Sequence, residues 1–386
     1  MAEPIYLDHA ATTPVRAEVR EAMDPFYGPR FGNPSSTHRW GREARAALDE
    51  ARSRIAQLIG ASVDEISFTS GGTEGDNLAI LGAFRALRAK GKVAAVTTTI
   101  EHKAVLAAVH RVAQEGGIER IVTVDASGLV DRASYDAAVR SDVAIVSVMW
   151  INNEIGVIQP IAELAAAAKA KGAFFHTDGV QAFGKVPVDL SKNPVDYFAF
   201  SGHKIGAPKG IGALYVRRGS PLEPLQYGGS QNRGQRPGTE NVAAAVGLAR
   251  AAELAVAEMA SEMKRLGDLR DRLQAALSER IPDAVVNGRG APRAPHILNI
   301  SVPGTDSESL LMALDLSGIA CSSGSACQSG SVDPSHVLLA IGASRELGVA
   351  AIRMSLGSLT TPEHIDRVVE RFPALVAKAR RLAAAS

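Results

Sequence analysis

The sequence predicts an α/β protein with a doubly wound, mostly parallel sheet in a large domain and a second, smaller α+β domain. Between residues 64 and 201, short apolar runs alternate with longer alanine-rich segments of helical period, which is the pattern of strands joined by crossover helices. Beyond residue 290 the order becomes strand, helix, strand, strand, helix, which indicates a separate unit. With 386 residues, 46% of them hydrophobic, the chain is long enough to bury both cores.

Six apolar runs are the expected strands of the large sheet, at 66-70, 93-99, 120-124, 143-149, 173-177 and 197-201. The segments 74-89, 102-114 and 160-171 carry apolar residues at three- and four-residue spacing, which indicates crossover helices. The run 212-218 follows a Gly- and Pro-rich connection that is too short for a helical crossover, so it should pair antiparallel.

The chain changes character at the linker 219-238, which is rich in Gly, Pro, Gln and Arg. Thr239 follows this linker as the expected N-cap of a long helix over about 240 to 279. The first dozen residues and the strands beyond residue 290 form the expected smaller domain. We therefore expect a large domain at 14-260 and a small α+β domain made of 1-13 and 261-386.

The charge balance and the cysteine content limit the partners and the compartment. Lys and Arg number 42 and Asp and Glu 41, a formal net charge of 42 − 41 = +1, which leaves no overall field to attract nucleic acid or an anionic membrane. Two cysteines do not make a disulfide framework and fit a reducing compartment. No run has the length of a signal peptide or a membrane helix. We expect a cytoplasmic protein without nucleic-acid or membrane partners.

A glycine-rich turn follows the first expected strand. Gly71, Gly72 and Thr73 separate that strand from a helix start, which leaves several backbone N–H groups free to bind a phosphate. A plain strand-to-helix turn capped by Thr73 is the alternative. The turn matches neither the dinucleotide-binding nor the nucleoside-triphosphate-binding glycine pattern, which argues against both ligands.

Functional groups follow two further strands. Asp178 and Gln181 come after one strand, and Ser201, His203 and Lys204 after the next. Singly, such an aspartate is usually a helix cap and such a lysine is usually exposed. Ligands of open α/β sheets bind outside the carboxyl ends of the strands, so these groups should meet the glycine turn. Together they supply what pyridoxal 5'-phosphate requires: a phosphate site, a carboxylate for the pyridine nitrogen and a lysine for the Schiff base.

Three more polar residues can complete such a site. His102, at a helix start, either caps the helix or stacks on the cofactor and shuttles a proton. Asn153 either lies in a polar loop or hydrogen-bonds to the cofactor's phenolic oxygen or a substrate carboxylate. Arg353 lies on an apolar strand, where a guanidinium needs a partner. It is either half of a structural ion pair or a bidentate clamp for an amino acid's carboxylate, and we favour the clamp.

The two cysteines have different surroundings. Cys321 follows Ile319 and Ala320, as a buried structural cysteine does. Cys327 lies among Ser and Gly, which can build an accessible loop but no core. It is the candidate nucleophile, provided that nearby positive charge favours its thiolate. Without companion ligands the two cysteines do not predict a metal site.

Nine short motifs occur in the order found in one family: YLDHAATTP, GNPSSTH, TSGGTEGDN, EHKAV, NNEIG, HTDGVQ, SGHKIGAPKGIGALYVRR, RPGTEN and SSGSAC. Together they resemble the pyridoxal-phosphate-dependent cysteine desulfurases, which belong to the class V aminotransferases of PLP fold type I. The SSGSAC segment resembles the iron-sulfur-assembly and nitrogen-fixation branch. The resemblance covers the chain from about residue 5 to 375.

The resemblance implies a role for each candidate residue. Lys204 would form the Schiff base, Asp178 would pair with the pyridine nitrogen and Gln181 with the phenolic oxygen. His102 would stack on the ring and act in catalysis with Lys204 and Cys327. Asn153 and Arg353 would bind the substrate carboxylate. The implied cofactor-binding residues are Gly72, Thr73, His102, Asn153, Asp178, Gln181, Ser201, His203, Lys204 and Thr239, the last from the other subunit of a homodimer.

The implied reaction converts L-cysteine to L-alanine. Cys327 would take the sulfur as a persulfide and pass it to an acceptor such as an iron-sulfur scaffold, where it could ligate iron during transfer. Selenocysteine lysis or another class V reaction, such as transamination, is the nearest alternative. A non-catalytic subunit is disfavoured because the lysine, aspartate and cysteine are all present, and a nicotinamide dehydrogenase because the glycine fingerprint is missing.

The sequence departs from the family at three places. Gly179 stands where relatives commonly carry alanine beneath the ring, and Gly75 falls in the first turn of the phosphate helix; both predict looser cofactor packing. The final helix ends at LAAAS, without the extension that often serves transfer to a scaffold, so the sulfur acceptor stays open.

Overall fold

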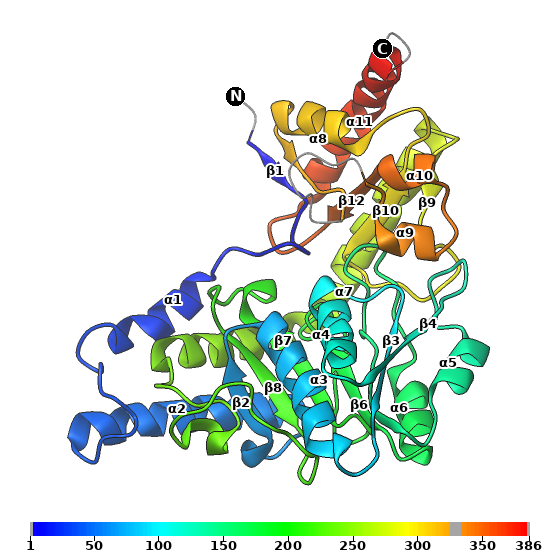
Figure 1. The fold of residues 1–386 in the computed structure, drawn as a ribbon. Helices are drawn as coiled ribbons and strands as arrows, with labels where there is room; N and C mark the ends of the chain where they lie inside the picture. The colour runs from blue at the N-terminus through cyan, green and yellow to red at the C-terminus, as the bar shows by residue number, and fades with distance from the viewer. Residues whose placement is uncertain (1–2, 325–332, 384–386) are drawn as a thin grey trace.

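The computed structural model describes residues 3–324 and 333–383, which form a large and a small lobe (Figure 1). The large lobe is built on a seven-stranded sheet with the order β2-β8-β7-β6-β5-β3-β4. Its strands are β2 (Ile66–Thr69), β3 (Ala94–Thr98), β4 (Ile118–Val122), β5 (Val143–Ser147), β6 (Phe174–Asp178), β7 (Tyr197–Ser201) and β8 (Gly212–Val216). All neighbours from β4 to β7 are parallel, and β8 is antiparallel to both β7 and β2. The predicted sheet and its antiparallel strand are confirmed, although β4 begins two residues before the expected run.

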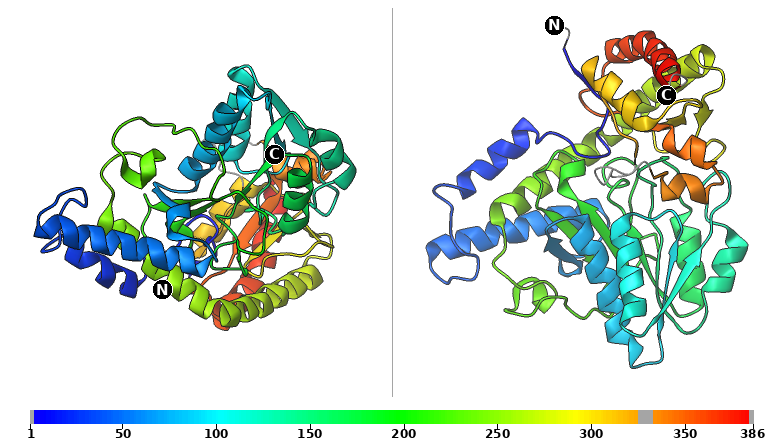
Figure 2. Two further views of the ribbon diagram at one scale, coloured as in Figure 1. Left: turned by 90° about the horizontal axis from the view of Figure 1, so that it is seen from below. Right: turned by 45° about the horizontal axis from the view of Figure 1, so that its top comes forward.

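Helices cover both faces of this sheet because successive strand residues point to opposite sides. Ala95 packs with α3 (Gly72–Arg88) and α4 (Lys103–Gln114). Its neighbours Ala94 and Val96 belong to the core on the other face, with α2 (Arg39–Leu58), α6 (Ile161–Ala170) and the start of α7. The three expected crossover helices are confirmed as α3, α4 and α6. The shorter helices α1 (Ala17–Met23) and α5 (Arg132–Ala138) complete the lobe (Figure 2).

The small lobe joins the two ends of the chain. Its antiparallel sheet has the order β12 (Ala351–Ser355), β10 (Ile297–Ser301), β9 (Val285–Val286), and β1 (Ile5–Tyr6) pairs in parallel with β11 (Ile319–Ala320). The helices of this lobe are α8 (Ser307–Leu316), α9 (His336–Ala340), α10 (Arg345–Val349) and α11 (Pro362–Ala383). The N-terminal segment therefore packs with the last third of the chain.

One helix, α7 (Val242–Arg280), serves both lobes. Residues near its start, such as Leu248, pack in the core of the large lobe, and Leu266, Leu273 and Leu277 pack in the core of the small lobe. The expected domain boundary at 260 lies inside this helix. Its N-cap is Asn241, which accepts the Ala244 N–H, so the expected cap at Thr239 is wrong: the shorter distance from Asn241 to the first turn decides the cap.

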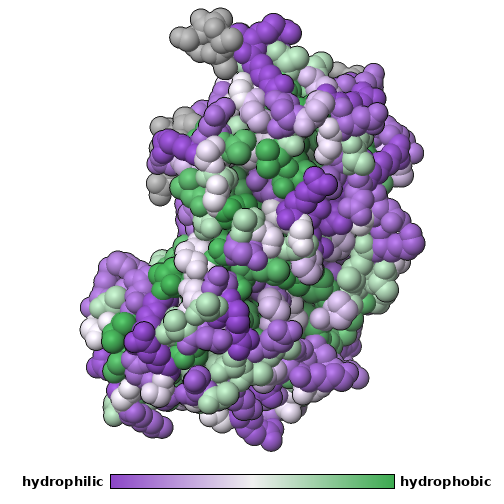
Figure 3. Space-filling view, turned by 90° about the vertical axis from the view of Figure 1, so that its right-hand side faces the viewer, coloured by the Kyte–Doolittle hydropathy of each residue, from purple (hydrophilic) through white to green (hydrophobic). Residues whose placement is uncertain are grey.

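The surface agrees with a chain of balanced charge. Hydrophilic side chains cover much of the face seen in Figure 3, and hydrophobic ones gather near the junction of the lobes. Among residues 3–324 and 333–383, none of the helices combines the length and the apolar composition needed to cross a membrane.

Candidate active site

A cavity of about 350 Å³ opens between the lobes at the carboxyl ends of β2, β3, β5, β6 and β7. Ten predicted site residues line it: Gly72, Thr73, His102, Asn153, Asp178, Gln181, Ser201, His203, Lys204 and Arg353. Thr239 lies in an exposed loop and is not part of this wall. Cys327 lies outside the described residues, although Ser322 and Gly324, shortly before it in the chain, line the cavity. The fold therefore brings together groups from five strand ends and from the small lobe.

The phosphate site expected at the glycine turn is the open N-terminus of α3. The N-cap is Gly71, without a side-chain cap, so the alternative in which Thr73 caps the helix does not hold. A Cβ added to Gly72 would lie 2.5 Å from Val180 Cγ2, and one added to Gly71 would lie 3.5 Å from Ser201 Oγ. The first N–H groups of a helix lack partners within it and favour anions. With the Ser201 hydroxyl beside them, they form a cradle suited to a phosphate.

His203 adds a neutral polar group to this cradle. Burial lowers the pKa of its imidazole to about 4, and the charges of Lys204 and Lys209 add to the effect. Its Nδ1 lies 3.1 Å from Thr12 Oγ1. At neutral pH the ring is uncharged, so it can hydrogen-bond to a ligand without a charge of its own.

Three buried carboxyl groups surround the floor of the cavity. Asp178 ends β6 and accepts the Val180 N–H at 2.8 Å. Burial raises the pKa of Asp178 above its ordinary value. Burial also raises the pKa of Glu101, to about 8. Burial also raises the pKa of Asp76 well above its ordinary value, and the charges of Asp178 and Glu101 add to this. A cation beside Asp178 would offset these costs, and a protonated pyridine nitrogen meets that requirement.

The amine of Lys204 lies close to main-chain acceptors from the N-terminal segment. Nζ donates to the carbonyl oxygens of Ala10 and Ala11, both at 2.6 Å. Burial lowers the pKa of Lys204 to about 8, and the charge of Arg353 adds to the shift, which Asp178 opposes. An amine with such a pKa is partly uncharged near neutral pH and can act as a nucleophile or a base.

Gln181 and His102 line the same cavity as Lys204. Gln181 donates from Nε2 to the carbonyl of Ala10 at 2.9 Å. His102 is the N-cap of α4, where its Nδ1 accepts the Ala104 N–H at 3.2 Å. His102 therefore caps the helix, as one of the two predicted alternatives has it. The residue also lines the cavity.

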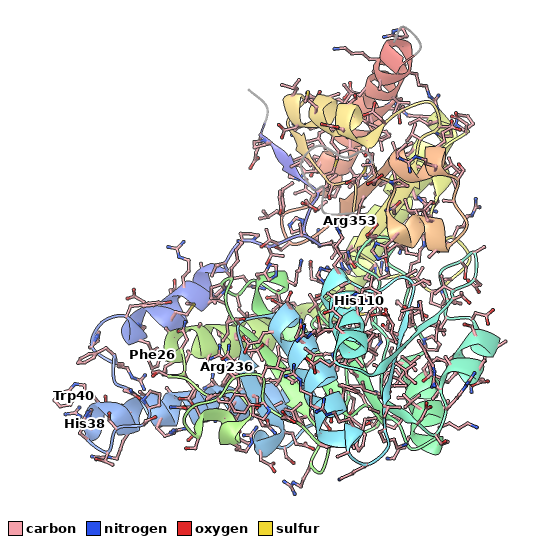
Figure 4. The ribbon with its side chains drawn as sticks, in the orientation of Figure 1. Phe26, His38, Trp40, His110, Arg236 and Arg353 are labelled. Carbon is pink, nitrogen blue, oxygen red and sulfur yellow. The ribbon has the colours of Figure 1, made fainter. Side chains whose placement is uncertain are left out.

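Arg353 is buried on β12 at the junction of the lobes (Figure 4). Its Nη2 lies 2.8 Å from Asp8 Oδ1, and Nη1 donates to the carbonyl oxygen of Asn153 at 2.9 Å. The ion-pair alternative is thus present in the structure. Nε is buried without a hydrogen-bond partner among the described residues, and the Arg353 side chain is part of the cavity wall.

Packing explains the surroundings of Cys321 and of Gly75 and Gly179, the two glycines at which the sequence departs from the family. Burial raises the pKa of Cys321 to about 12, which agrees with a structural thiol. A Cβ on Gly179 would lie 1.9 Å from Phe198 Cε2, and one on Gly75 would lie 2.9 Å from Ala199 Cβ. Both glycines permit close packing of protein against protein. At both positions protein atoms already occupy the space that a Cβ would need, and looser cofactor packing stays a prediction.

Five residues that contribute to the site escaped prediction from sequence: Asp8, Asp76 and Glu101 with their carboxylates, and Ala10 and Ala11 with their carbonyls. Asp76 and Glu101 lie next to predicted residues in the chain, but nothing in the pattern distinguishes them from surface carboxylates. Asp8 reaches Arg353 from the opposite end of the sequence. Such contacts depend on the tertiary fold and leave no local periodic signal.

The donors fit one cofactor class. A helix N-terminus with Ser201 and neutral His203 suits a phosphate, buried Asp178 suits a cationic ring nitrogen, and Lys204 has the amine that an aldehyde requires. These are the functional groups of pyridoxal 5'-phosphate.

Comparisons with known proteins agree with this chemistry. The family model described as aminotransferase class-V matches residues 5–368. The chain is 46% identical over 382 residues to the cysteine desulfurase IscS of Dictyoglomus turgidum, covering 99% of this chain and 97% of that protein. It is 45% identical to the cysteine desulfurase NifS of Azotobacter vinelandii, covering 98% and 94%.

Solved structures give the same result. A NifS-like protein matches with a TM-score of 0.91 at 36% identity, over 97% of this chain and all of the other. DndA from Streptomyces lividans matches with a TM-score of 0.78 at 41% identity, over 91% and 99% of the two chains.

Proposed function

The chain belongs to the class-V aminotransferase family, and from this premise we infer that it is a pyridoxal-phosphate-dependent cysteine desulfurase. The observation that carries the inference is the meeting of Lys204, Asp178 and the α3 N-terminus in one cavity, in a chain about 45% identical to cysteine desulfurases over nearly its whole length. The enzyme converts L-cysteine to L-alanine and takes up the sulfur.

Each cofactor-facing residue has a proposed role. Thr73, Ser201 and His203 hold the phosphate with the Gly72 N–H group. Asp178 pairs with the ring nitrogen and Gln181 with the phenolic oxygen, while His102 stacks on the ring. When bound, pyridoxal phosphate supplies an electron sink for the negative charge that develops at Cα of the amino acid. Lys204 attaches the cofactor through its amine.

The substrate is positioned by the small lobe. We propose that Arg353 and Asn153, which both line the cavity, bind the carboxylate of L-cysteine. Asp8 already neutralises part of that guanidinium, so it lowers the cost of burying Arg353 before the substrate arrives. Lys204, uncharged above a pKa of about 8, removes the Cα proton and later returns a proton to the carbon skeleton.

Sulfur transfer is assigned to Cys327. Its thiolate attacks the substrate's sulfur, the carbon–sulfur bond breaks with its electron pair left on carbon, and carbon takes up a proton. The products are L-alanine and a persulfide on Cys327, so atoms and electrons balance. Cys321 is excluded as the nucleophile because burial raises its pKa to about 12.

Three further proposals concern the oligomeric state of the protein, its cellular compartment and the acceptor of its sulfur. We propose a cytoplasmic homodimer in which Thr239 reaches the phosphate of the partner's site. Tyr27, Phe31, Trp40 and Tyr227 are exposed large aromatic side chains, a pattern typical of a surface that another subunit covers. Trp40 and His38 lie at the outer end of α2, far from Arg353 (Figure 4). An iron-sulfur scaffold is the proposed sulfur acceptor.

The test is a single turnover with L-cysteine. Wild type loaded with pyridoxal phosphate should form one alanine per active site, and Cys327→Ser should form none while its cofactor absorption band stays unchanged. Cys321→Ser is the matched control and should keep the activity. Alanine formation by Cys327→Ser at the wild-type rate would overturn the assignment of the nucleophile.

A further inference from the structure

A second cavity, of about 570 Å³, lies behind the active site between the lobes. Lys185, His9 and His296 line it, and so does Lys204, which also lines the catalytic cavity. Gln181 belongs to the wall of the catalytic cavity alone. Gln181 and Lys185 thus form part of the partition between the two cavities, one residue on each side.

A continuous set of hydrogen bonds crosses this partition. Lys185 Nζ donates to Gln181 Oε1 at 3.2 Å. Gln181 Nε2 donates to the carbonyl of Ala10 at 2.9 Å, and Lys204 Nζ donates to the same carbonyl at 2.6 Å. His296 Nε2 also lies 3.5 Å from Gln181 Oε1. The amide of Gln181 is therefore connected to both lysines.

These contacts determine which way the amide faces. An ammonium can only donate a hydrogen bond, and a main-chain carbonyl can only accept one. If the amide turned by 180°, its N–H₂ would face the Lys185 ammonium and its oxygen would face the oxygen of Ala10. The contact with Ala10 would be repulsive at any pH, and the contact with Lys185 whenever its amine is charged, so both residues favour the orientation that places the N–H₂ group toward the Lys204 side.

From this geometry we propose that Lys185 is a positioning residue for the reaction: it fixes the Gln181 amide so that its second N–H is available to the phenolic oxygen of the cofactor. The inference rests on the proposed function and adds a residue to it. Lys185 touches neither cofactor nor substrate in this role and acts through Gln181.

The surroundings of Lys185 explain why this residue needs its acceptor. Burial lowers the pKa of Lys185 to about 7, and the positive charges of Lys204 and Arg353 add to the shift. His9 and His296 also face this amine, and its charge contributes to their lowered pKa values. In such a basic environment the oxygen of Gln181 is the acceptor that favours the ammonium form. The hydrogen bond between Lys185 and Gln181 therefore favours the charged form of the lysine and fixes the orientation of the amide.

The test compares Lys185→Met with Lys185→Arg, which keeps a donor. The control is Lys192→Met, which removes an exposed lysine paired with Asp189 in the same segment. Three readouts are measured: the equilibrium Kd of pyridoxal phosphate for the apoprotein, the pH midpoint of the absorption change of the bound cofactor, and kcat and KM for L-cysteine. Losses of about 10- to 100-fold are typical when an outer partner of a site ligand is removed. We expect a tenfold or larger fall in kcat and a shifted midpoint for Lys185→Met, recovery in Lys185→Arg, and no change in the control.

A double substitution separates positioning from general structure. If Lys185 acts through Gln181, the double variant Lys185→Met/Gln181→Ala should have the same Kd and midpoint as Gln181→Ala alone. The proposal would be overturned if the changes caused by the two single substitutions multiplied in the double variant. It would also be overturned if Lys185→Met had the same Kd, midpoint and kcat as the control Lys192→Met. Should Lys185→Met not fold, Lys185→Arg decides: values within twofold of wild type support positioning and a tenfold loss contradicts it. Because the Kd and midpoint need no turnover, they test Lys185 even if the wild type lacks desulfurase activity.

Discussion

The two walls of the catalytic cavity are built differently. On the large-lobe wall, Asp178 and Ser201 end adjacent strands, and their places are set by backbone pairing with Ala199 and Gly212. On the small-lobe wall, the backbone of Arg353 is paired with Asn299 of β10, but its guanidinium is held by Asp8 and by one carbonyl. A wall set by strand register is rigid before any ligand binds, whereas side-chain contacts can be exchanged for those of a substrate. The cofactor wall is thus preorganised and the substrate wall is responsive.

The largest effect is expected on the rigid wall. Asp178→Asn keeps the shape of the side chain but removes the charge that stabilises a cationic ring nitrogen, so kcat/KM for L-cysteine should fall about 1000-fold. Steady-state kinetics with saturating cofactor measure the change. Asp136→Asn, on the exposed face of α5, is the control and should behave as wild type. A loss below tenfold would mean that the rigid wall is not the source of catalysis.

The responsive wall should show its effect in substrate affinity. Arg353→Lys keeps a positive charge but loses the forked geometry, so two hydrogen bonds to charged or carbonyl groups become one. We expect KM for L-cysteine to rise about 100-fold, while the Kd of pyridoxal phosphate stays within twofold of wild type. Equal changes in the two constants would remove the distinction between the walls.

Rigidity itself can be tested with one methyl group. Gly179→Ala would place a Cβ 1.9 Å from Phe198 Cε2, and such overpacking costs about 1–3 kcal/mol of unfolding free energy. Denaturant unfolding measures the loss. Gly28→Ala, where a Cβ meets nothing within 4 Å, should leave stability within about 0.5 kcal/mol. If Gly179→Ala has the same free energy of unfolding as wild type, the packing around this residue can shift to accept the added methyl group, and the wall is not rigid.

The smallest effect concerns pH. The folded-state pKa of Lys204 is lowered to about 8, so the free amine is the minor form below that value and the dominant form above it. The rate at which the apoprotein captures pyridoxal phosphate should therefore rise up to tenfold per pH unit below about 8 and level off above it. Stopped-flow absorbance records the rate. A plateau beginning near pH 10 would show that the pocket does not depress the pKa of this amine.

The sequence predicts the rigid wall better than the responsive one. Strand ends can be located from apolar runs, so Asp178, Ser201 and Lys204 were placed together correctly. The partners of Arg353 were not, because Asp8 lies at the other end of the chain and comes close only in the folded protein. Thr239 was misplaced as a cap for a local reason: Asn241 competes for the same N–H groups and is nearer to them. No local sequence pattern indicates that Asp76 is buried, because its burial follows from the packing of α3 on the sheet.

The pairing of β1 with β11 has a consequence for biosynthesis. Ile5 leaves the ribosome among the first residues, yet its partner Ile319 is made near the end, and Asp8 bridges to Ser355 later still. The carbonyls of Ala10 and Ala11 that hold Lys204 belong to this same early segment. The large lobe can fold during translation, but β1 has no partner strand until Ile319 and Ala320 have been made. The wall that carries Arg353 is therefore synthesised last, after every strand of the large sheet.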